Sequence, residues 1–306
     1  MNRDAIKTGN LLVVGMGLIG GSLALGLRRS GFAETITAWN RSPQTRQLLL
    51  DMGLVDYLPE SLELAVASAD MIVIGVPTLT VASVFEVIRE HAKPGVVMTD
   101  VASVKGSVIE AARSVFGSVP EDFVPGHPIA GAEKSGPEAS QMDLFKGHRV
   151  ILTPLAHTRT EALRLVTHMW QDCAAEVVEL DHQTHDRVLA MTSHLPHVLA
   201  YSLVDFLVQQ DDRAALFRFA AGGFRDSTRI ASSDVTMWRD ICLANRQPLL
   251  DAIDMYNDRL QALRSAISDS NGDAIASVFQ RARDARAEYL KMIELDMAET
   301  DRADGN

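Results

Sequence analysis

The sequence predicts an α/β protein in which a doubly wound parallel sheet is followed by an all-α domain. In the first half, short β-branched runs alternate with segments of helical periodicity, and a glycine-rich turn follows the first run. After Asp181 the helical patterns become long, and no further convincing strand follows. We therefore expect two domains, at residues 1–181 and 182–306.

The expected strands are short and apolar. They lie at residues 11–15, 35–39, 71–77, 96–101, 149–154 and 176–181, with a shorter one at 123–126. Segments with a 3.6-residue period, such as 22–31 and 79–91, separate them and predict β-α-β units. In the second half, residues 184–208 and 246–268 are expected to be helical, and Pro196 should kink or break the first of these helices.

Composition excludes several classes of protein. The 306 residues are 47% hydrophobic and 23% charged, as in ordinary globular chains. The formal net charge of −11, without a basic run, argues against nucleic-acid binding. No apolar run approaches the ~18 residues that would cross a bilayer, and the N-terminus does not resemble a signal peptide. Cys173 and Cys242 lie far apart, which predicts a reducing, cytoplasmic location and no thiolate metal site.

The glycine-rich turn predicts a dinucleotide site. Residues 15–20 read G-x-G-x-x-G, directly after the first strand and at the start of a helix. Glycines permit a tight turn and a close approach of the backbone, while the helix N-terminus offers free N–H groups to a pyrophosphate. This context predicts a Rossmann-like fold, with cofactor contacts from Gly15, Gly17, Leu18, Ile19 and Gly20. Val76 and Pro77, at the end of the strand 71–77, are assigned to the same site.

The end of the second strand bears on which dinucleotide binds. An NAD site usually places an acidic residue there, against the ribose 2′-hydroxyl, but this chain has Asn40, Arg41 and Ser42. Arg41 suits a 2′-phosphate, to which Asn40 and Ser42 are able to donate. We therefore favour NADP over NAD. The alternative is that Arg41 is a solvated surface charge and that either cofactor is used.

Ser103 and His127 are the candidate catalytic residues. Ser103 follows the fourth strand, at the sheet edge where ligands of doubly wound folds bind, although a helix N-cap explains it equally well. His127 is expected in a loop between Pro125-Gly126 and Pro128, and a histidine held on a stiff turn suits proton transfer near neutral pH. The alternative for His127 is a loop histidine that caps a neighbouring carbonyl.

Two further polar groups lie in the helical half. His194 and His197 have the spacing of a metal pair, but no further ligands cluster with them, so no metal is expected. Arg225 and Arg229 follow a glycine pair, and both are placed to project from one helix face towards an anion such as a carboxylate. The alternative is a solvated helix in which Asp226 pairs with an arginine.

Five motifs, in order, resemble the prephenate/arogenate dehydrogenase family of tyrosine biosynthesis: VVGMGLIGGSLALGLR, DVASVK, GHPIAGAEKSG, MTSHLPH and GGFRDSTRIASSDVTMWRDI. The resemblance covers roughly residues 10–294. It implies an NAD(P)-dependent oxidative decarboxylation of prephenate or arogenate, by a protein that dimerises through its helical domain.

The resemblance also implies residue roles. His127 would accept the ring hydroxyl proton, Ser103 would position that hydroxyl, and Arg229 would bind the ring carboxylate. His197, Glu133, Gly222 and Trp238 would line or orient the substrate pocket. The acid that many family members carry after the second strand is missing, and the sequence does not rank prephenate against arogenate or assign roles to His194 and Asp226. If tyrosine inhibits, we expect it to compete at the active site.

Two other functions remain to be compared. A 3-hydroxyacid-type dehydrogenase would use a lysine from its helical domain, but no lysine occurs between Asp181 and Asn271. A non-catalytic dinucleotide sensor would keep the fold without the chemistry, and gives no reason for Ser103, His127, His197 and Arg229 to occur together.

Overall fold

The computed structural model describes residues 7–131 and 134–304. The chain forms two compact units, residues 1–249 and 250–306, and each is described by itself. The domain boundary expected at residue 181 therefore stays a prediction. Several helices after residue 181 belong to the first unit. Among them, α7 (His182–Leu189) packs on α5 (Lys105–Phe116), and α11 (Val235–Ala244) packs on the turn at Thr78–Thr80.

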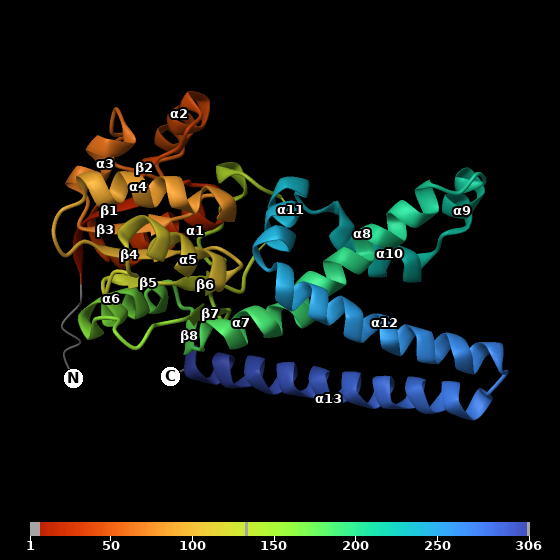
Figure 1. Cartoon of the computed structure of the whole chain (residues 1–306). Coiled ribbons are helices and arrows are strands. Elements are labelled where there is room, and N and C mark those ends of the chain that lie inside the picture. The colour runs from red at the N-terminus through yellow and green to blue at the C-terminus, as the bar shows by residue number, and fades with distance from the viewer. Residues whose placement is uncertain (1–6, 132–133, 305–306) are drawn as a thin grey trace. The chain divides into compact units, whose positions relative to one another are not determined.

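A five-stranded parallel sheet in the order β2-β1-β3-β4-β5 forms the centre of the first unit (Figure 1). Val14 pairs with Trp39 on one side and Ile74 on the other, so these strands end at one edge. The bounds are β1 Thr8–Val14, β2 Ala33–Trp39, β3 Met71–Ile74, β4 Val97–Asp100 and β5 Phe123–Val124.

Helices cover both faces of this sheet, because its buried strands are apolar on both sides. Leu11 and Val13 face one core, with α1 and α6, while Leu12 and Val14 face another, with α3, α4 and α5. This arrangement confirms the doubly wound sheet. The helices are α1 Leu18–Ser30, α2 Pro43–Asp51, α3 Leu62–Ser68, α4 Val81–His91, α5 Lys105–Phe116 and α6 Thr160–Gln171, with short 3-10 turns at Thr78–Thr80 and Pro137–Ala139.

A second sheet of three strands, β6 Gly126–Pro128, β7 Arg149–Leu152 and β8 Glu176–Glu179, lies beside the first. β6 and β7 are antiparallel, whereas β7 and β8 are parallel. The expectation that His127 lies in a loop is wrong, because its residue pairs with Ile151 in this sheet. Pro128 is compatible with the strand because β6 pairs only with β7 in this sheet and so lies at its edge.

The helical segment of the first unit begins with α7 His182–Leu189, a π-helical turn at Ala190–His194 and α8 Leu195–Val208. Pro196 lies in the first turn of α8, which confirms the expected break. Proline lacks an N–H and clashes with the carbonyl one turn earlier, and the wider π turn accommodates both effects. The segment continues with α9 Arg213–Phe219, α10 Gly222–Thr228, a 3-10 turn Arg229–Ser232, and α11 Val235–Ala244.

The second unit consists of two helices. α12 spans Arg246–Ser268 and passes into this unit at Leu250, and α13 spans Gly272–Asp304. Asn271 separates them and caps α13 by accepting a 3.0 Å hydrogen bond from the Ala274 amide. In the described part of the chain no strand follows β8, and no helix is long and apolar enough to span a membrane.

Candidate active site

The glycine-rich turn has the shape that the motif predicts. Gly15 has φ +85°, and a Cβ there would lie 2.8 Å from the backbone of Gly75 and Val76. At Gly20 a Cβ would press on Val13 at 3.0 Å, whereas at Gly17 it would meet nothing within 4 Å. Gly15 thus permits the turn, and Gly20 permits the close contact between α1 and β1. Gly17 leaves open space at the N-terminus of α1. A pyrophosphate fits this open space.

Asn40 holds this turn from the end of β2. Its Oδ1 accepts from the Met16 amide at 2.9 Å, and its Nδ2 donates to the Met16 carbonyl at 3.2 Å. Ser42 is also engaged, because its hydroxyl caps α2 by accepting from the Thr45 amide at 3.2 Å. Of the three residues that we assigned to a 2′-phosphate, Arg41 is thus the one whose side chain suits that role.

A cavity of about 450 Å³ opens at the edge where the strands end, and we call it the sheet-edge cavity. It brings together the five residues assigned to the turn, Val76, Pro77, Ser103 and His127. The opposite wall comes from the start of α11 and the residues before it. These residues are Ser233, Asp234, Thr236, Met237, Asp240 and Ile241.

Ser103 faces this cavity and is not a helix cap. The N-cap position of α5 is Val104, whose side chain makes no capping bond. Asp186 of α7 caps the helix instead, because its two carboxylate oxygens accept from the Lys105 and Gly106 amides, each at 2.8 Å. The Ser103 hydroxyl is thereby available to a ligand in the cavity.

His127 is 8% exposed and lies at the cavity with its Nδ1 turned towards α7. That nitrogen is 2.9 Å from Nε2 of His185, and Nδ1 of His185 is 2.8 Å from Oδ1 of Asp186. Burial is the main cause that holds the pKa of His127 well below its usual value, and the charge of the Lys105 ammonium adds to it. His127 is therefore neutral at pH 7 and does not cap a carbonyl.

A buried ion pair lies beneath His127. The Lys105 ammonium is fully buried, contacts the Asp100 carboxylate, and donates to the carbonyl of Gly126. Asp100 also accepts from the Gly126 amide at 3.1 Å and the Ala102 amide at 2.9 Å. Burial lowers the pKa of Lys105, while Asp100 opposes that shift. This network fixes β6, and with it His127, to the end of β4.

His197 and Trp238 form a stacked pair between α8 and α11. Their ring centroids are 3.5 Å apart at an interplanar angle of 18°, and His194 meets the same indole edge-on at 6.0 Å. His197 Nδ1 lies 2.8 Å from the carbonyl of Ser193. Burial lowers the pKa of His197, and the positive charge of Arg229 adds to the effect. Arg229 begins the 3-10 turn Arg229–Ser232, which packs against α8, the helix that carries His197.

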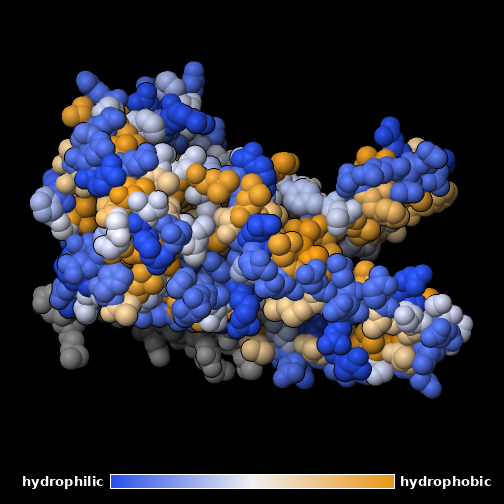
Figure 2. Space-filling view, viewed as in Figure 1, coloured by the Kyte–Doolittle hydropathy of each residue, from blue (hydrophilic) through white to orange (hydrophobic). Residues whose placement is uncertain are grey.

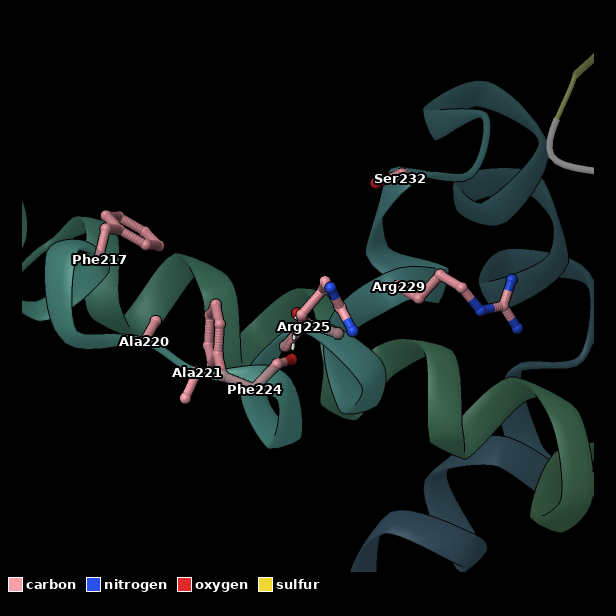
Figure 3. Close-up of a pocket in the computed structure, with 8 residues that line it drawn as sticks. Phe217, Ala220, Ala221, Phe224, Arg225, Arg229 and Ser232 are labelled. Atoms are coloured by element: carbon pink, nitrogen blue, oxygen red, sulfur yellow. Dashed lines mark hydrogen bonds between the residues drawn. The ribbon is translucent and has the colours of Figure 1, made fainter.

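Arg229 also lines a second cavity of about 450 Å³, which we call the arginine cavity (Figure 3). Phe217, Phe224 and Arg225 line it as well. Figure 3 shows that Arg229 extends away from the phenylalanine rings, while exposed Arg225 pairs with Asp226 at 3.3 Å. The two arginines therefore do not converge on one anion. Gly222 does not line this cavity, and a Cβ there would meet nothing within 4 Å.

Glu133 lies outside the described residues. Within the described ranges no group of histidine, cysteine and acidic side chains has the geometry of a metal site. His194 is buried, and its Nδ1 lies 3.0 Å from Nδ2 of Asn245, which also donates to the Asp186 carbonyl at 2.8 Å. Burial lowers the pKa of His194 to about 4.

The arrangement pairs a nucleotide-shaped cradle with a neutral imidazole and a hydroxyl in one cavity. Nδ1 of His127 is hydrogen-bonded to His185, and the other ring nitrogen, Nε2, is suited to accept a proton from a bound alcohol. Sequence reasoning missed His185, Asp186, Lys105, Asp100 and Asn245. A weak signal for two of them exists, since His185 and Asp186 are adjacent ionisable residues in a predicted amphipathic helix, but their partners lie far away in the chain.

The chain is similar to known proteins along nearly its whole length. Residues 23–179 match the description "Prephenate dehydrogenase, nucleotide-binding domain", and residues 181–281 match "Prephenate dehydrogenase, dimerization domain". It is 34% identical to the cyclohexadienyl dehydrogenase of Zymomonas mobilis over 90% of this chain and 94% of that protein. It is also 34% identical to the prephenate dehydrogenase of Bacillus subtilis, over 90% and 75%.

Solved structures agree with these matches. The prephenate dehydrogenase of Aquifex aeolicus, in complex with hydroxyphenyl propionate and NAD⁺, superposes with a TM-score of 0.88 at 34% identity over 94% of this chain and all of that chain. The arogenate dehydrogenase of Synechocystis has a TM-score of 0.78 at 27% identity, over 92% and 99%. These similarities and the geometry of the glycine-rich turn lead to one conclusion: the chain belongs to the prephenate dehydrogenase family of NAD(P)-dependent oxidoreductases.

Proposed function

We propose that the protein catalyses the NAD(P)-dependent oxidative decarboxylation of prephenate, arogenate or both. The observation that carries this proposal is that Ser103 and His127 line the same cavity as the glycine-rich turn. An alcohol in this cavity meets both the proton acceptor and the cradle for the cofactor. The chain has no lysine from Asp181 to Asn271, which argues against 3-hydroxyacid chemistry.

Each side chain has a definite task in this scheme. The turn and the N-terminus of α1 hold the pyrophosphate, and the bound cofactor supplies the hydride acceptor. His127 accepts the hydrogen bond of the ring hydroxyl and then its proton, and Ser103 orients that hydroxyl. The family resemblance assigns the ring carboxylate to Arg229 and a wall of the pocket to the stacked His197 and Trp238, although these three residues do not line the sheet-edge cavity. The pocket roles of Gly222 and Glu133 rest on the family resemblance alone.

The proton balance explains why a neutral histidine suits the reaction. The substrate loses one hydride and its ring carboxylate, as CO₂, and the product keeps its oxygen as a phenol hydroxyl. No proton is released overall, so the hydroxyl proton is taken up while the carbonyl forms and is returned to the phenolate. His127, buried and with a lowered pKa, takes the proton transiently and returns it readily.

We further propose that the cofactor is NADP, held by Arg41 at the 2′-phosphate. A guanidinium matches a phosphate, and no acidic side chain stands at the end of β2 to repel it. Arg41→Ala should weaken NADP⁺ binding by roughly 10-fold, consistent with the loss of one charge-assisted contact, and leave NAD⁺ binding within about 2-fold. Equal effects on the two cofactors, measured by fluorescence titration, would contradict the assignment.

The proposed assembly is a homodimer formed through the helical domain. The match to the family's dimerization domain supports it, as do exposed apolar side chains on α8 and α9, among them Leu203, Phe206 and Phe219. Figure 2 shows apolar surface over this part of the chain. Light scattering at micromolar concentration should give twice the chain mass, and a monomer would refute the proposal.

The two cysteines are unpaired, which supports a reducing compartment such as the cytoplasm.

The direct test is an initial-rate assay of prephenate and arogenate, each with NAD⁺ and NADP⁺, followed at the absorbance of the reduced cofactor. Turnover with either substrate, and one CO₂ for each reduced cofactor, is expected. Cofactor binding without turnover in all four combinations would favour the non-catalytic sensor.

A further inference from the structure

Behind His127 lies a row of hydrogen-bonded groups that ends at a helix N-terminus. Nδ1 of His127 contacts Nε2 of His185 at 2.9 Å, and Nδ1 of His185 contacts Oδ1 of Asp186 at 2.8 Å. Asp186 in turn accepts from the first two amides of α5. His185 is fully buried and Asp186 is 7% exposed, so water does not compete for these bonds.

The protons in this row are assigned from its acidic end. Burial raises the pKa of Asp186, but hydrogen bonds from His185 and from the amides of Lys105 and Gly106 outweigh that effect and hold it below its usual value. The carboxylate is therefore ionised and only accepts. Nδ1 of His185 must then donate, and a ring that carries only this one proton has Nε2 as an acceptor. His127 consequently donates from Nδ1, and its Nε2 carries no proton.

We propose that His185 and Asp186 are positioning residues that hold His127 in its Nδ1–H tautomer and so present an unprotonated Nε2 to the sheet-edge cavity. The proposal deepens the proposed function, on which its catalytic consequence rests. The tautomer itself is a property of the protein without ligands.

In this proposal the His185 ring carries one proton, at Nδ1. A protonated ring would add a second buried cation to a region that already holds the fully buried Lys105 ammonium, and buried charges are costly unless they are paired. Asp100 already pairs with Lys105, and the Asp186 charge is met by the N-terminus of α5. The row therefore needs no permanent positive charge.

The same row serves the reaction when His127 takes up the hydroxyl proton at Nε2. Its Nδ1–H bond to His185 then becomes charge-assisted, and His185 passes part of the charge to the Asp186 carboxylate. When the proton returns to the phenolate oxygen, the original arrangement is restored. Atoms and charges balance without a further reactant.

Nitrogen-15 NMR of the full chain, labelled at its histidines and free of ligands, tests the tautomer. His127→Asn identifies the two signals of His127. We expect Nδ1 to be protonated and Nε2 to show the shift of an unprotonated nitrogen at pH 7. A protonated Nε2 with a bare Nδ1 would overturn the proposal whether or not the protein turns over prephenate or arogenate.

A pair of substitutions at His185 separates positioning from packing. In His185→Gln, Oε1 is able to accept from His127, so the Nδ1–H tautomer should persist and kcat should fall by no more than about 5-fold. His185→Leu removes the acceptor, so signals of the Nε2–H tautomer should appear. In that variant kcat should fall roughly 100-fold with little change in KM, because a wrong histidine tautomer impairs general-base catalysis.

The matched control is His182→Leu, three residues earlier on the same helix. His182 lies beside Asp181 at 3.5 Å and is partly exposed, so its loss should leave both tautomer and kcat unchanged. Cofactor affinity and melting temperature report on folding in all variants. An unchanged tautomer and a kcat within 2-fold of wild type in His185→Leu would refute the role of this row.

Discussion

His127 owes its chemical character to the groups that surround it. Burial and the nearby Lys105 ammonium favour the neutral imidazole, and the contact with His185 engages Nδ1. An imidazole that stays neutral is ready to accept a proton over a wide range of pH. The same residue on the protein surface would be partly protonated near neutral pH and would then be unable to act as a base.

We expect the lowered pKa of His127 to set the acidic limb of the pH profile. The base works only when unprotonated, and a lowered pKa keeps it unprotonated to more acidic pH. The fall of kcat/KM on the acidic side should therefore have an apparent pKa below 6.5, the ordinary value for histidine. Initial rates from pH 4.5 to 8 measure this limb. An apparent pKa of 7 or above would contradict the environment described here.

His194 should make the protein less stable in acid. In the unfolded chain His194 takes up a proton with its ordinary pKa of 6.5, whereas in the folded protein burial lowers the pKa of His194 to about 4. The stabilisation is thus present above pH 6.5 and is lost as the pH falls towards 4, by up to about 3 kcal/mol at pH 4. Urea unfolding at several pH values measures it. His194→Asn, which keeps an acceptor for Asn245, should show a shallower dependence, and equal slopes would speak against His194.

Local signals in the sequence predict some residues of the candidate site and not others. The positions of Ser103 and His127 after short strands at a sheet edge, together with the family motifs, predict both, and the two residues line one cavity. His185 and Asp186 could not be selected, because their roles depend on pairing with His127 and with amides about 60 to 80 residues away. Asn40 was assigned to the cofactor, because its bonds to Met16 appear only when β2 lies beside β1.

Among the elements, the turn between β1 and α1 distinguishes two glycines by the space around them. Gly15→Ala would place a Cβ at φ +85° and 2.8 Å from backbone atoms, and should destabilise the protein by about 2 kcal/mol or more. Gly17→Ala meets no protein atom and should change stability by less than about 1 kcal/mol, since ordinary Gly→Ala effects are of that size.

Although Gly17→Ala should have little effect on stability, it should weaken cofactor binding. We expect the pyrophosphate to approach the open side of Gly17, so a methyl group should weaken cofactor binding at least roughly 10-fold, the effect of about 1.4 kcal/mol. Thermal unfolding and cofactor titration of both variants measure the two effects. Full affinity in Gly17→Ala would place the pyrophosphate elsewhere.

Helix ends were the hardest elements to predict. The break at Pro196 follows from proline chemistry, but the π turn before it, which carries His194, depends on how α7 and α8 pack. The cap of α5 comes from α7 rather than from the adjacent Ser103. The strand β6 was not predicted, because three residues that include a proline are too few to show the alternation of a strand. Only its pairing with β7 defines it.

At the scale of the whole molecule, one cavity receives its walls from segments more than 200 residues apart. The glycine-rich turn begins at residue 15, and the facing wall ends at Ile241 on α11. The alternation of strands and helices predicted the doubly wound sheet, because this pattern is local and repeated. It did not predict that α7 and α11 pack with the sheet in a single compact unit, since such contacts leave no periodic trace in the sequence.

The central claim is that His127 accepts the substrate proton in a cavity that also holds the cofactor. The most direct test compares wild type with His127→Asn for two quantities, kcat with the better of prephenate and arogenate, and the dissociation constant of the cofactor. We expect kcat to fall about 10³-fold, within the range for loss of a general base, and the dissociation constant to change less than about 2-fold. A variant that keeps wild-type turnover would contradict the account, as would one that loses cofactor binding in proportion to its activity.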